Sequence, residues 1–295
     1  MKRVIVVLGV VALMVMGVFG ATAKPEPDKK VVYKTVGDVK LELHIFNPAG
    51  HKASDKTPAI VFFFGGGWVG GKPSQFYPQS AYLASRGMVA ACAQYRTKKG
   101  HKTTPAECVK DGKSAVRWMR MHSDELGINP NMLAAGGGSA GGHVAAAIGT
   151  LKGFEESGED ISVSSRPNAL VLFNPVYDNG PKGYGHKRVK EYWKDFSPME
   201  NIDANTPPTT VFLGDKDSLV PVATAQKYKA LMEKFGVRSD LHLYEGQPHG
   251  FFNKTKYYET VLEADKFLVS LGYLKGEPTV SIYGRDGARP SRIFK

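Results

Sequence analysis

The chain has 295 residues, of which 42% are hydrophobic, so it is long enough for one large domain or two small ones and apolar enough to bury a core. Its two cysteines exclude a disulfide framework, and no internal repeat or long low-complexity run is present. A formal net charge of +11 would suit acidic partners such as anionic polysaccharide or nucleic acid. However, the lysines and arginines form no clustered stripe with aromatic residues. We therefore predict a solvated basic surface and no nucleic-acid partner.

The first 23 residues have the order of a secretory signal peptide. Lys2 and Arg3 precede an apolar run at residues 4–18, and an A-x-A cleavage site ends at Ala23. The apolar run is shorter than the roughly 20 residues that a membrane-spanning helix needs, so a membrane anchor is the less favoured alternative. We therefore predict a secreted or periplasmic protein that is cleaved after Ala23 and then has no stable membrane anchor.

Strand and helix patterns alternate along the chain after a polar segment at residues 24–30. Residues 41–45 alternate between apolar and polar, the period of a half-buried strand, and such early strands suit an antiparallel edge. The later predicted elements are strand 59–64, helix 79–85, strand 88–95, helix 108–126 with Pro105 in its first turn, strand 132–135, helix 140–149, strands 169–173 and 210–213, helix 222–235, strand 241–244 and helix 257–271. This alternation predicts an α/β fold in one domain, residues 24–295, with a mostly parallel central sheet and helices on both faces.

Two segments and the cysteines leave alternatives open. Residues 151–208 contain few periodic patterns but several aromatic residues, so they form either a cap or insertion over the active face or ordinary connecting structure. The C-terminal tail, residues 273–295, is rich in glycine, arginine and lysine and is expected to pack loosely. Cys92 and Cys108 either form a disulfide or remain free, and neither has the spacing of a metal ligand.

A glycine-rich stretch, "AAGGGSAGGHVAA", fits two motifs that demand different chemistry. It contains G-x-G-x-x-G from Gly136 to Gly141, a dinucleotide-binding pattern, and G-x-S-x-G centred on Ser139, the turn that carries a serine nucleophile. Both motifs belong between a strand and a helix, where this stretch lies. The dinucleotide pattern also requires an acidic residue about 20 positions later at the end of a strand, whereas Glu155 and Glu156 lie in a polar segment. We therefore favour the serine hydrolase.

The residues that a serine nucleophile needs follow in the expected order. A serine requires a histidine as base and an acid to orient that histidine, and in α/β-hydrolases these follow as Ser, Asp or Glu, then His. Asp215 and Asp217 come directly after the predicted strand 210–213, and His249 lies in a turn after strand 241–244. Three adjacent glycines follow the strand at 59–64, where their backbone N–H groups can approach a substrate.

These segments resemble the α/β-hydrolase fold, and more narrowly the hormone-sensitive-lipase-like and acetyl-xylan-esterase-like (BD-FAE-type) esterases. The resemblance extends over residues 40–271 and is carried by "FFFGGGWVGG", "AQYR", "PAECVKDGKSAVRWMR", "GINPNMLAAGGGSAGGHVAA", "NPVYD", "FSP", "PPTTVFLGDKDSLVP" and "PHGFFN". It implies a secreted carboxylic ester hydrolase that needs no cofactor or metal. The implied roles are Ser139 as nucleophile, His249 as general base and acid, Asp217 as the orienting acid, and the N–H groups of Gly66, Gly67 and Ala140 as the oxyanion hole.

Two positions depart from the pattern of these families, and one choice depends on it. The usual H-G-G-G begins here with Phe64 in place of histidine, and the residue before the serine, often acidic, is Gly138. The acid of the motif precedes x-L-V-P, which selects Asp217 over Asp215. Because His249 must be neutral to act as a base, we expect activity to fall below about pH 6.5, the reference value for an unperturbed histidine.

The substrate is predicted less directly than the reaction. Trp68, Tyr184 and Trp193 could stack on sugars or could line an acyl pocket, and export favours short acyl esters such as those of acetylated polysaccharide. The alternatives are a lipase or a peptidase of the same fold, or a catalytically silent binding protein. The sequence makes no prediction of oligomeric state.

Three further residues are predicted to have structural roles. His143, on the first turn of the helix after the serine, is expected to pack or to contact the rim of the substrate. Glu107 and Asp111 are expected to form structural pairs, with Arg96 as one partner.

Overall fold

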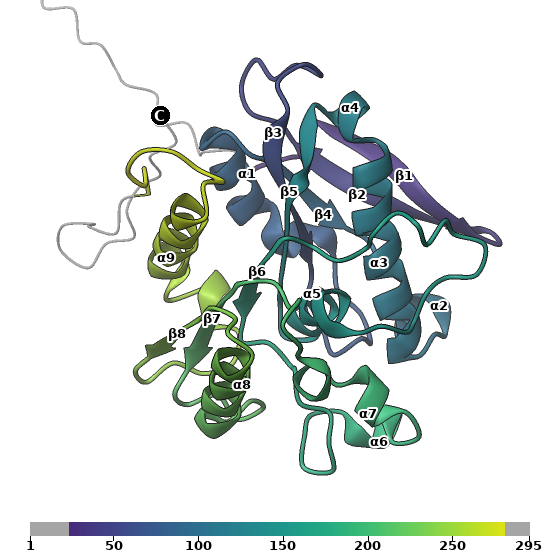
Figure 1. Ribbon diagram of the computed structural model, residues 1–295, viewed down its shortest axis with the longest axis vertical. Helices are drawn as coiled ribbons and strands as arrows, with labels where there is room; N and C mark the ends of the chain where they lie inside the picture. The colour runs from purple at the N-terminus through teal and green to yellow at the C-terminus, as the bar shows by residue number, and fades with distance from the viewer. Residues whose placement is uncertain (1–23, 281–295) are drawn as a thin grey trace, which may run out of the picture.

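An eight-stranded sheet runs through the computed structural model, which describes residues 24–280 (Figure 1). The strands are β1 (Lys29–Val36), β2 (Val39–Phe46), β3 (Thr57–Phe63), β4 (Val89–Ala93), β5 (Ile128–Gly138), β6 (Ala169–Phe173), β7 (Thr209–Gly214) and β8 (Ser239–Tyr244). Their order is β1-β2-β4-β3-β5-β6-β7-β8, with antiparallel pairing of β1 with β2 and of β2 with β4 and parallel pairing elsewhere. The predicted mostly parallel sheet with an antiparallel edge is thus confirmed.

Helices cover both faces of this sheet, as predicted. They are α1 (Tyr77–Ser85), α2 (Lys98–His101), α3 (Pro105–Met121), α4 (Ser123–Leu126), α5 (Ala140–Thr150), α6 (His186–Val189), α7 (Trp193–Phe196), α8 (Val222–Lys234) and α9 (Tyr257–Ser270), with 3-10 turns η1 (Pro73–Phe76), η2 (Pro198–Asn201) and η3 (Phe251–Asn253). α3, α5 and α8 share one hydrophobic core, whereas α1 and α9 share the other (Figure 1). β3, β4 and β6 are buried along most of their length, which explains their continuous apolar sequences.

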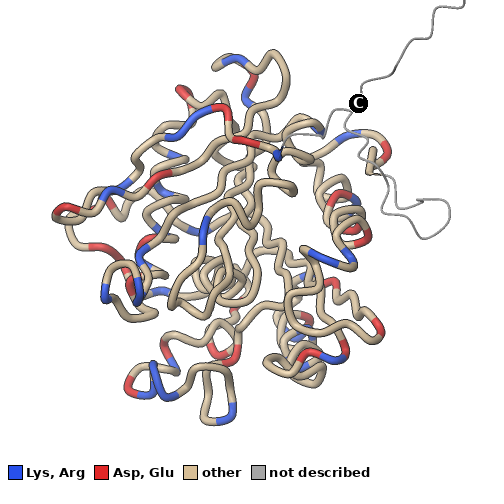
Figure 2. The backbone as a smooth tube through the Cα atoms, turned by 180° about the vertical axis from the view of Figure 1, so that it is seen from behind, with Lys and Arg blue, Asp and Glu red and all other residues tan. Residues whose placement is uncertain are grey.

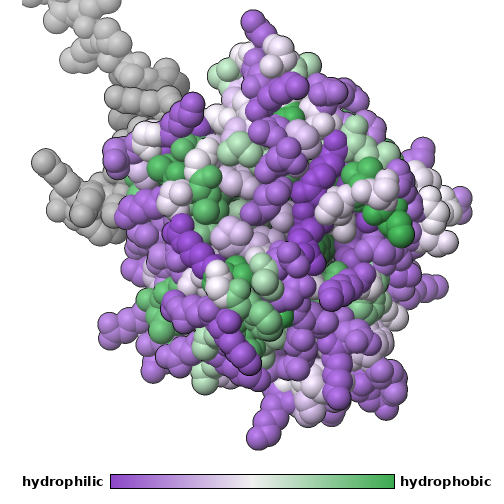
Figure 3. Space-filling model, viewed as in Figure 1, coloured by the Kyte–Doolittle hydropathy of each residue, from purple (hydrophilic) through white to green (hydrophobic). Residues whose placement is uncertain are grey.

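Charged residues lie mainly around the periphery of the fold. In Figure 2 the central strands are mostly free of Lys, Arg, Asp and Glu, and both signs are dispersed over the surrounding loops and helices. The face in Figure 3 is mostly hydrophilic, with small, separate hydrophobic patches. Within residues 24–280, no helix combines the length and the apolar character required to cross a bilayer.

The bounds of two elements, α3 and β5, differ most from prediction. α3 begins at Pro105 because Thr104 and Glu107 form a reciprocal capping box, and it ends at Met121 before the separate short helix α4. β5 runs from Ile128 to Gly138, beyond the predicted 132–135. The glycines at its end belong to the strand. At Gly136 there is no room for a side chain, because a Cβ there would lie 2.6 Å from the Phe62 ring.

The polar segment predicted at residues 24–30 overlaps the start of an unpredicted strand, β1. This strand lies at the edge of the sheet and is only partly buried, so its sequence, KKVVYKTV, mixes lysines with valines and contains no long apolar run.

The segment at residues 151–208 combines connecting structure with a short helical excursion. It contains the central strand β6, after which α6, α7 and η2 form before β7 begins. The start of the tail is packed rather than loose, because Tyr273 and Leu274 are buried against the α1 and α9 core. The predicted signal peptide, residues 1–23, and tail residues 281–295 lie outside the described residues.

The two cysteines are free and buried. The Cys92 thiol lies 3.1 Å from the Ser80 hydroxyl, and the Cys108 thiol donates to the Arg96 carbonyl oxygen at 3.1 Å. Of the two alternatives left open by the sequence, the cysteines are therefore free rather than joined in a disulfide, and they act as small buried groups of the core.

Candidate active site

Ser139 occupies a sharp turn between β5 and α5. Its backbone angles, φ 55° and ψ −120°, are strained for a residue with a Cβ atom. Glycines make the turn possible on both sides: a Cβ at Gly137 would lie 2.4 Å from the Gly141 carbonyl oxygen, and one at Gly141 would lie 2.1 Å from the Phe63 carbonyl oxygen. This is the strand–turn–helix geometry that presents a serine hydroxyl at the carboxyl end of a parallel sheet.

The imidazole of His249 joins the Ser139 hydroxyl to a carboxylate. Its Nε2 lies 2.8 Å from Ser139 Oγ, and its Nδ1 lies 2.7 Å from Asp217 Oδ2. The Asp217 side chain is fully buried, and its Oδ1 accepts the backbone N–H groups of Leu219 and Val220 at 2.8 and 2.9 Å. Because a carboxylate only accepts hydrogen bonds, His249 donates its Nδ1–H to Asp217, and its Nε2 is left able to accept from the serine hydroxyl.

The two aspartates in the turn after β7 have different environments. Asp215 is exposed, and its Oδ1 accepts the Gly246 N–H at 2.7 Å, so it supports the turn that follows β8. Asp217 is the one placed against His249. The structure thus brings together Ser139, Asp217 and His249, the three residues predicted to form a catalytic set.

Asn174 is a further site residue that the sequence analysis missed. It follows β6 with φ 35°, a value that asparagine tolerates better than most residues, and it is completely buried. Its Oδ1 accepts the Gly250 N–H at 3.1 Å, which directs its Nδ2 toward His249 Nε2 at 3.4 Å. An Asn-Pro pair at the end of a buried strand was the available signal, because that edge of the sheet carries the other site residues.

The glycine loop after β3 lies directly against the Ser139 turn. A Cβ at Gly65 would come within 2.8 Å of the Gly138 carbonyl oxygen and 3.2 Å of Ser139 Cβ. Gly66 has φ 134°, and a Cβ there would lie 1.8 Å from the Gly70 carbonyl oxygen, so no other residue fits without rearrangement. The Gly65 N–H donates to Gln75 Oε1 at 2.5 Å, which fixes the loop from its outer side.

Ala140 and Gly67 are the other two predicted contributors to the oxyanion hole. Ala140 is buried and is the first residue of α5, so its backbone N–H belongs to the positive end of an 11-residue helix. Gly67, with φ 63°, lies on the glycine loop beside the Tyr184 hydroxyl, which would be 2.9 Å from a Cβ at that position. Phe64, which replaces the histidine of the usual motif, packs instead against Tyr95 with ring centroids 4.0 Å apart.

Comparisons with known proteins agree with this geometry. The BD-FAE family model matches residues 43–178, and the Dienelactone hydrolase family model matches residues 179–273. The apo structure of Thermogutta terrifontis esterase 2 is 43% identical, with a TM-score of 0.82 over 87% of this chain and 98% of that chain. The chain belongs to the esterases of the α/β-hydrolase fold. Other structures of the same Thermogutta enzyme are described as propionate-bound, butyrate-bound and phosphorylated by paraoxon.

More distant relatives of this α/β-hydrolase include two named esterases. The acetylxylan esterase of Xylanibacter ruminicola is 29% identical over 82% of this chain and 50% of its own length. Esterase LipC of Mycobacterium tuberculosis is 28% identical over 66% of this chain and 53% of its own length. The chain spans about half the length of these curated relatives.

The aromatic residues proposed from sequence to bind substrate have three different environments in this α/β-hydrolase. Trp68 is 1% exposed and packs edge-to-face on His143, so burial removes it as a platform for sugars. Tyr184 is half-buried, with its hydroxyl beside the glycine loop. Trp193 is also half-buried and packs on His186, with ring centroids 6.1 Å apart.

His143 is a structural residue in this fold. It is completely buried, stacks on Phe196 with centroids 4.3 Å apart, and its Nε2 donates to the Phe196 carbonyl oxygen at 3.1 Å. Burial lowers the pKa of His143 to about 3, so the imidazole stays neutral in the folded protein. It takes the packing role expected from the sequence.

The acidic residues of α3 make structural contacts. Asp111 is completely buried and pairs with Arg96 and Lys34, each at 2.7 Å, whereas Glu107 completes the Thr104 capping box. Within the part of the chain that the structure describes, no group of three His, Cys, Asp or Glu residues is arranged to hold a metal ion.

Proposed function

We propose that this protein is a carboxylic ester hydrolase in which Ser139 is the nucleophile, His249 the general base and acid, and Asp217 the orienting acid. The observation that carries the proposal is the continuous hydrogen-bonded chain from Ser139 Oγ through both ring nitrogens of His249 to Asp217 Oδ2. The 43% identity to Thermogutta esterase 2 over nearly all of that chain supports it.

The reaction proceeds by acyl transfer in two steps. Ser139 Oγ attacks the ester carbonyl carbon while His249 Nε2 takes the hydroxyl proton, and the same nitrogen then gives this proton to the departing alcohol. In the second step, water loses a proton to His249 and attacks the acyl carbon, and the ester bond to Ser139 breaks as His249 returns the proton to Ser139 Oγ, which releases the acid. The buried carboxylate of Asp217 stabilises the imidazolium formed in each step.

The negative charge that develops on the carbonyl oxygen is proposed to be stabilised by backbone N–H groups of Gly66, Gly67 and Ala140. The glycine loop lies against the Ser139 turn, and the N-terminus of α5 begins at Ala140, so both sources of donors are beside the nucleophile. Removing one such donor costs on the order of 10²–10³ in rate in comparable sites.

The substrates are proposed to be short acyl esters, such as acetyl groups on polysaccharide. Thermogutta esterase 2 has been solved with propionate and with butyrate, which are short acids. The acetylxylan esterase among the relatives acts, by its name, on an acetylated polysaccharide.

A series of 4-nitrophenyl esters from acetate to palmitate, measured with wild type and Ser139→Ala, tests the function. We expect a maximum at acetate or butyrate, loss of hydrolysis in the variant, and acetate release from acetylated xylan. A maximum at long chains would identify a lipase, and faster cleavage of peptide 4-nitroanilides would identify a peptidase. Equal rates for wild type and Ser139→Ala would rule out the mechanism. If wild type hydrolyses none of the substrates, the alternative of a catalytically silent binding protein is favoured.

We further propose that the protein is exported, to the medium or the periplasm, and is cleaved after Ala23. The basic residues, the apolar run and the A-x-A site are the support for this proposal. N-terminal sequencing of protein recovered outside the cytoplasm is expected to begin at Lys24. Protein that stays in the membrane fraction with Met1 intact would contradict it.

A further inference from the structure

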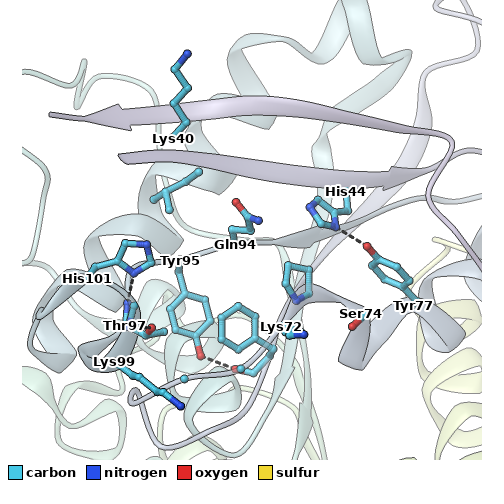
Figure 4. Close-up of a pocket in the computed structure, with 16 residues that line it drawn as sticks. Lys40, His44, Lys72, Ser74, Tyr77, Gln94, Tyr95, Thr97, Lys99 and His101 are labelled. Atoms are coloured by element: carbon cyan, nitrogen blue, oxygen red, sulfur yellow. Dashed lines mark hydrogen bonds between the residues drawn. The ribbon is translucent and has the colours of Figure 1, made fainter. Parts of the chain in front are cut away.

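A large cavity opens beside the glycine loop, on the side where β2 begins and β4 ends. Its volume is about 800 Å³, in the range of ligand-binding pockets. Figure 4 shows that the residues lining it come from β2, from the segments that follow β3 and β4, from η1 and from α2. The stacked rings of Phe64 and Tyr95 form part of its wall.

The charged side chains that line this cavity are all basic. Lys72 and Lys99 contribute ammonium groups, whereas the Lys40 side chain extends away from the cavity (Figure 4), and no aspartate or glutamate is among the lining residues. Within residues 24–280, none of these three lysines is in an ion pair, so their charges are not used by the fold. The cavity therefore presents donors and positive charge to whatever enters it.

The histidine in the cavity wall adds hydrogen-bonding capacity rather than charge. His44 Nδ1 lies 2.5 Å from the Tyr77 hydroxyl, and its Nε2 lies 3.4 Å from Glu42, the nearest acid. Burial, together with the charge of Lys30, lowers the pKa of His44, so this ring is neutral at neutral pH. The positive charge of the cavity at that pH accordingly comes from the lysines.

One residue, Gly65, separates the cavity wall from the proposed nucleophile. Phe64 and Gly71 line the cavity, and a Cβ at Gly71 would lie 2.5 Å from the Gly65 carbonyl oxygen. A Cβ at Gly65 would in turn lie 3.2 Å from Ser139 Cβ. The cavity and the proposed nucleophile thus lie on opposite sides of the Gly65 backbone, so a ligand that occupies both has to be several sugar units long and cross the glycine loop.

A second cavity, with a volume of about 380 Å³, is also basic. Its charged lining residues are Lys98, Lys102 and Arg188, and no aspartate or glutamate is among the described residues that line it. The Arg188 guanidinium donates to the Gly67 carbonyl oxygen at 2.5 Å, which ties this residue to the glycine loop.

We propose that the larger cavity binds the carboxylates of an acidic polysaccharide, so that the ester cleaved at Ser139 belongs to a sugar chain that contains uronic acid. Ammonium groups on flexible lysines attract carboxylates as point charges. The inference rests on the proposed esterase function and names the class of its substrate.

The test compares a charge-reversed cavity with a matched control. Lys72→Glu/Lys99→Glu reverses two charges in the cavity, and Lys227→Glu/Lys234→Glu reverses two exposed charges on α8. KM is measured for an acetylated oligogalacturonide and for an acetylated xylo-oligosaccharide without uronic acid. We expect the ratio of KM for the acidic substrate to KM for the neutral one to rise about tenfold in the cavity variant, because each reversal replaces an attraction by a repulsion. The control variant is expected to keep the wild-type ratio.

Two additional measurements make every outcome decisive. Lys72→Gln/Lys99→Gln should give an intermediate ratio, and melting curves exclude any variant that has unfolded. The inference is overturned if the cavity and control variants have the same ratio, or if wild type prefers the neutral substrate at low salt. Hydrolysis of 4-nitrophenyl acetate by wild type separates the two proposals: if it is absent the esterase function fails, and if it is present only the acidic substrate is rejected.

Discussion

Ser139 Oγ and His249 Nε2 lie 2.8 Å apart, although 110 positions separate the two residues in the chain. The contact forms because β5 and β8 are parallel members of one sheet, and the turns that follow them emerge at the same edge. Neither the Ser139 nor the His249 side chain is buried in a core, so packing does not explain why a strained turn holds the hydroxyl against the imidazole. A catalytic role does explain this contact.

The two aspartates after β7 provide a matched pair of variants. Asp217→Asn removes the acceptor that holds His249 Nδ1–H, and we expect kcat to fall on the order of 10⁴-fold. Asp215→Asn changes an exposed side chain two positions away and is expected to keep most of the activity. Steady-state kinetics with 4-nitrophenyl acetate measures both, and comparable losses in the two variants would contradict the role given to Asp217.

Asn174 is predicted to influence protonation at His249. Asn174→Asp keeps the acceptor for the Gly250 N–H but places a negative charge near His249 Nε2, which favours the protonated imidazole. The acid limb of the kcat/KM profile should therefore move to higher pH, by about one unit for a nearby opposite charge. Asn205→Asp, on an exposed loop, is the control, and identical profiles for the two variants would argue against contact with the base.

Buried His143 is predicted to make the fold sensitive to acid. Its pKa is about 3 in the folded protein because of burial, against 6.5 for an ordinary histidine, so the unfolded chain binds the proton first as pH falls. Stability is therefore lost between pH 6.5 and pH 3, by about 1.4 kcal/mol per pH unit. His143→Gln removes this titration, and urea unfolding at pH 7 and pH 5 should show about 2 kcal/mol less loss for the variant than for wild type. Equal losses would contradict the prediction.

Asp111 is predicted to be essential for stability rather than for chemistry. Its buried carboxylate pairs with Arg96 and Lys34, so Asp111→Ala leaves these two buried cations with only the half-buried Glu156 as an acidic partner, and we expect the free energy of unfolding to fall by about 3–5 kcal/mol. Asp124→Ala, at an exposed site on α4, is the control and should cost less than about 1 kcal/mol. Chemical denaturation measures both, and a loss below 1 kcal/mol for Asp111→Ala would contradict the account.

Much of this architecture could be predicted because buried parallel strands have a distinctive sequence pattern. β3 and β6 are short apolar runs, and the segments between strands show helical periodicity, so their order along the chain implies the fold. Ser139, Asp217 and His249 could be placed together because each follows a strand at the same end of the sheet. The choice of Asp217 over Asp215 relied on motif spacing, because two aspartates in one turn have the same chemistry and similar sequence surroundings.

The features that escaped prediction depend on tertiary contacts. β1 has no apolar run because it is an edge strand, and the glycines of β5 resemble a turn until the Phe62 ring is found against Gly136. Trp68 looks like a surface platform in the sequence, but packing from α5 and α7 buries it. Asn174 has only the Asn-Pro pair after β6 as a sequence signal, and its distance to His249 is what assigns it to the site.

Covalent trapping of the nucleophile tests the central claim most directly. Paraoxon phosphorylates Thermogutta esterase 2, and a serine activated by a histidine is the group that such a reagent attacks. We predict that one equivalent of paraoxon abolishes esterase activity, and that peptide mapping by mass spectrometry locates a single diethylphosphoryl group on Ser139. An adduct on another residue, or continued hydrolysis after Ser139 is fully modified, would contradict the account.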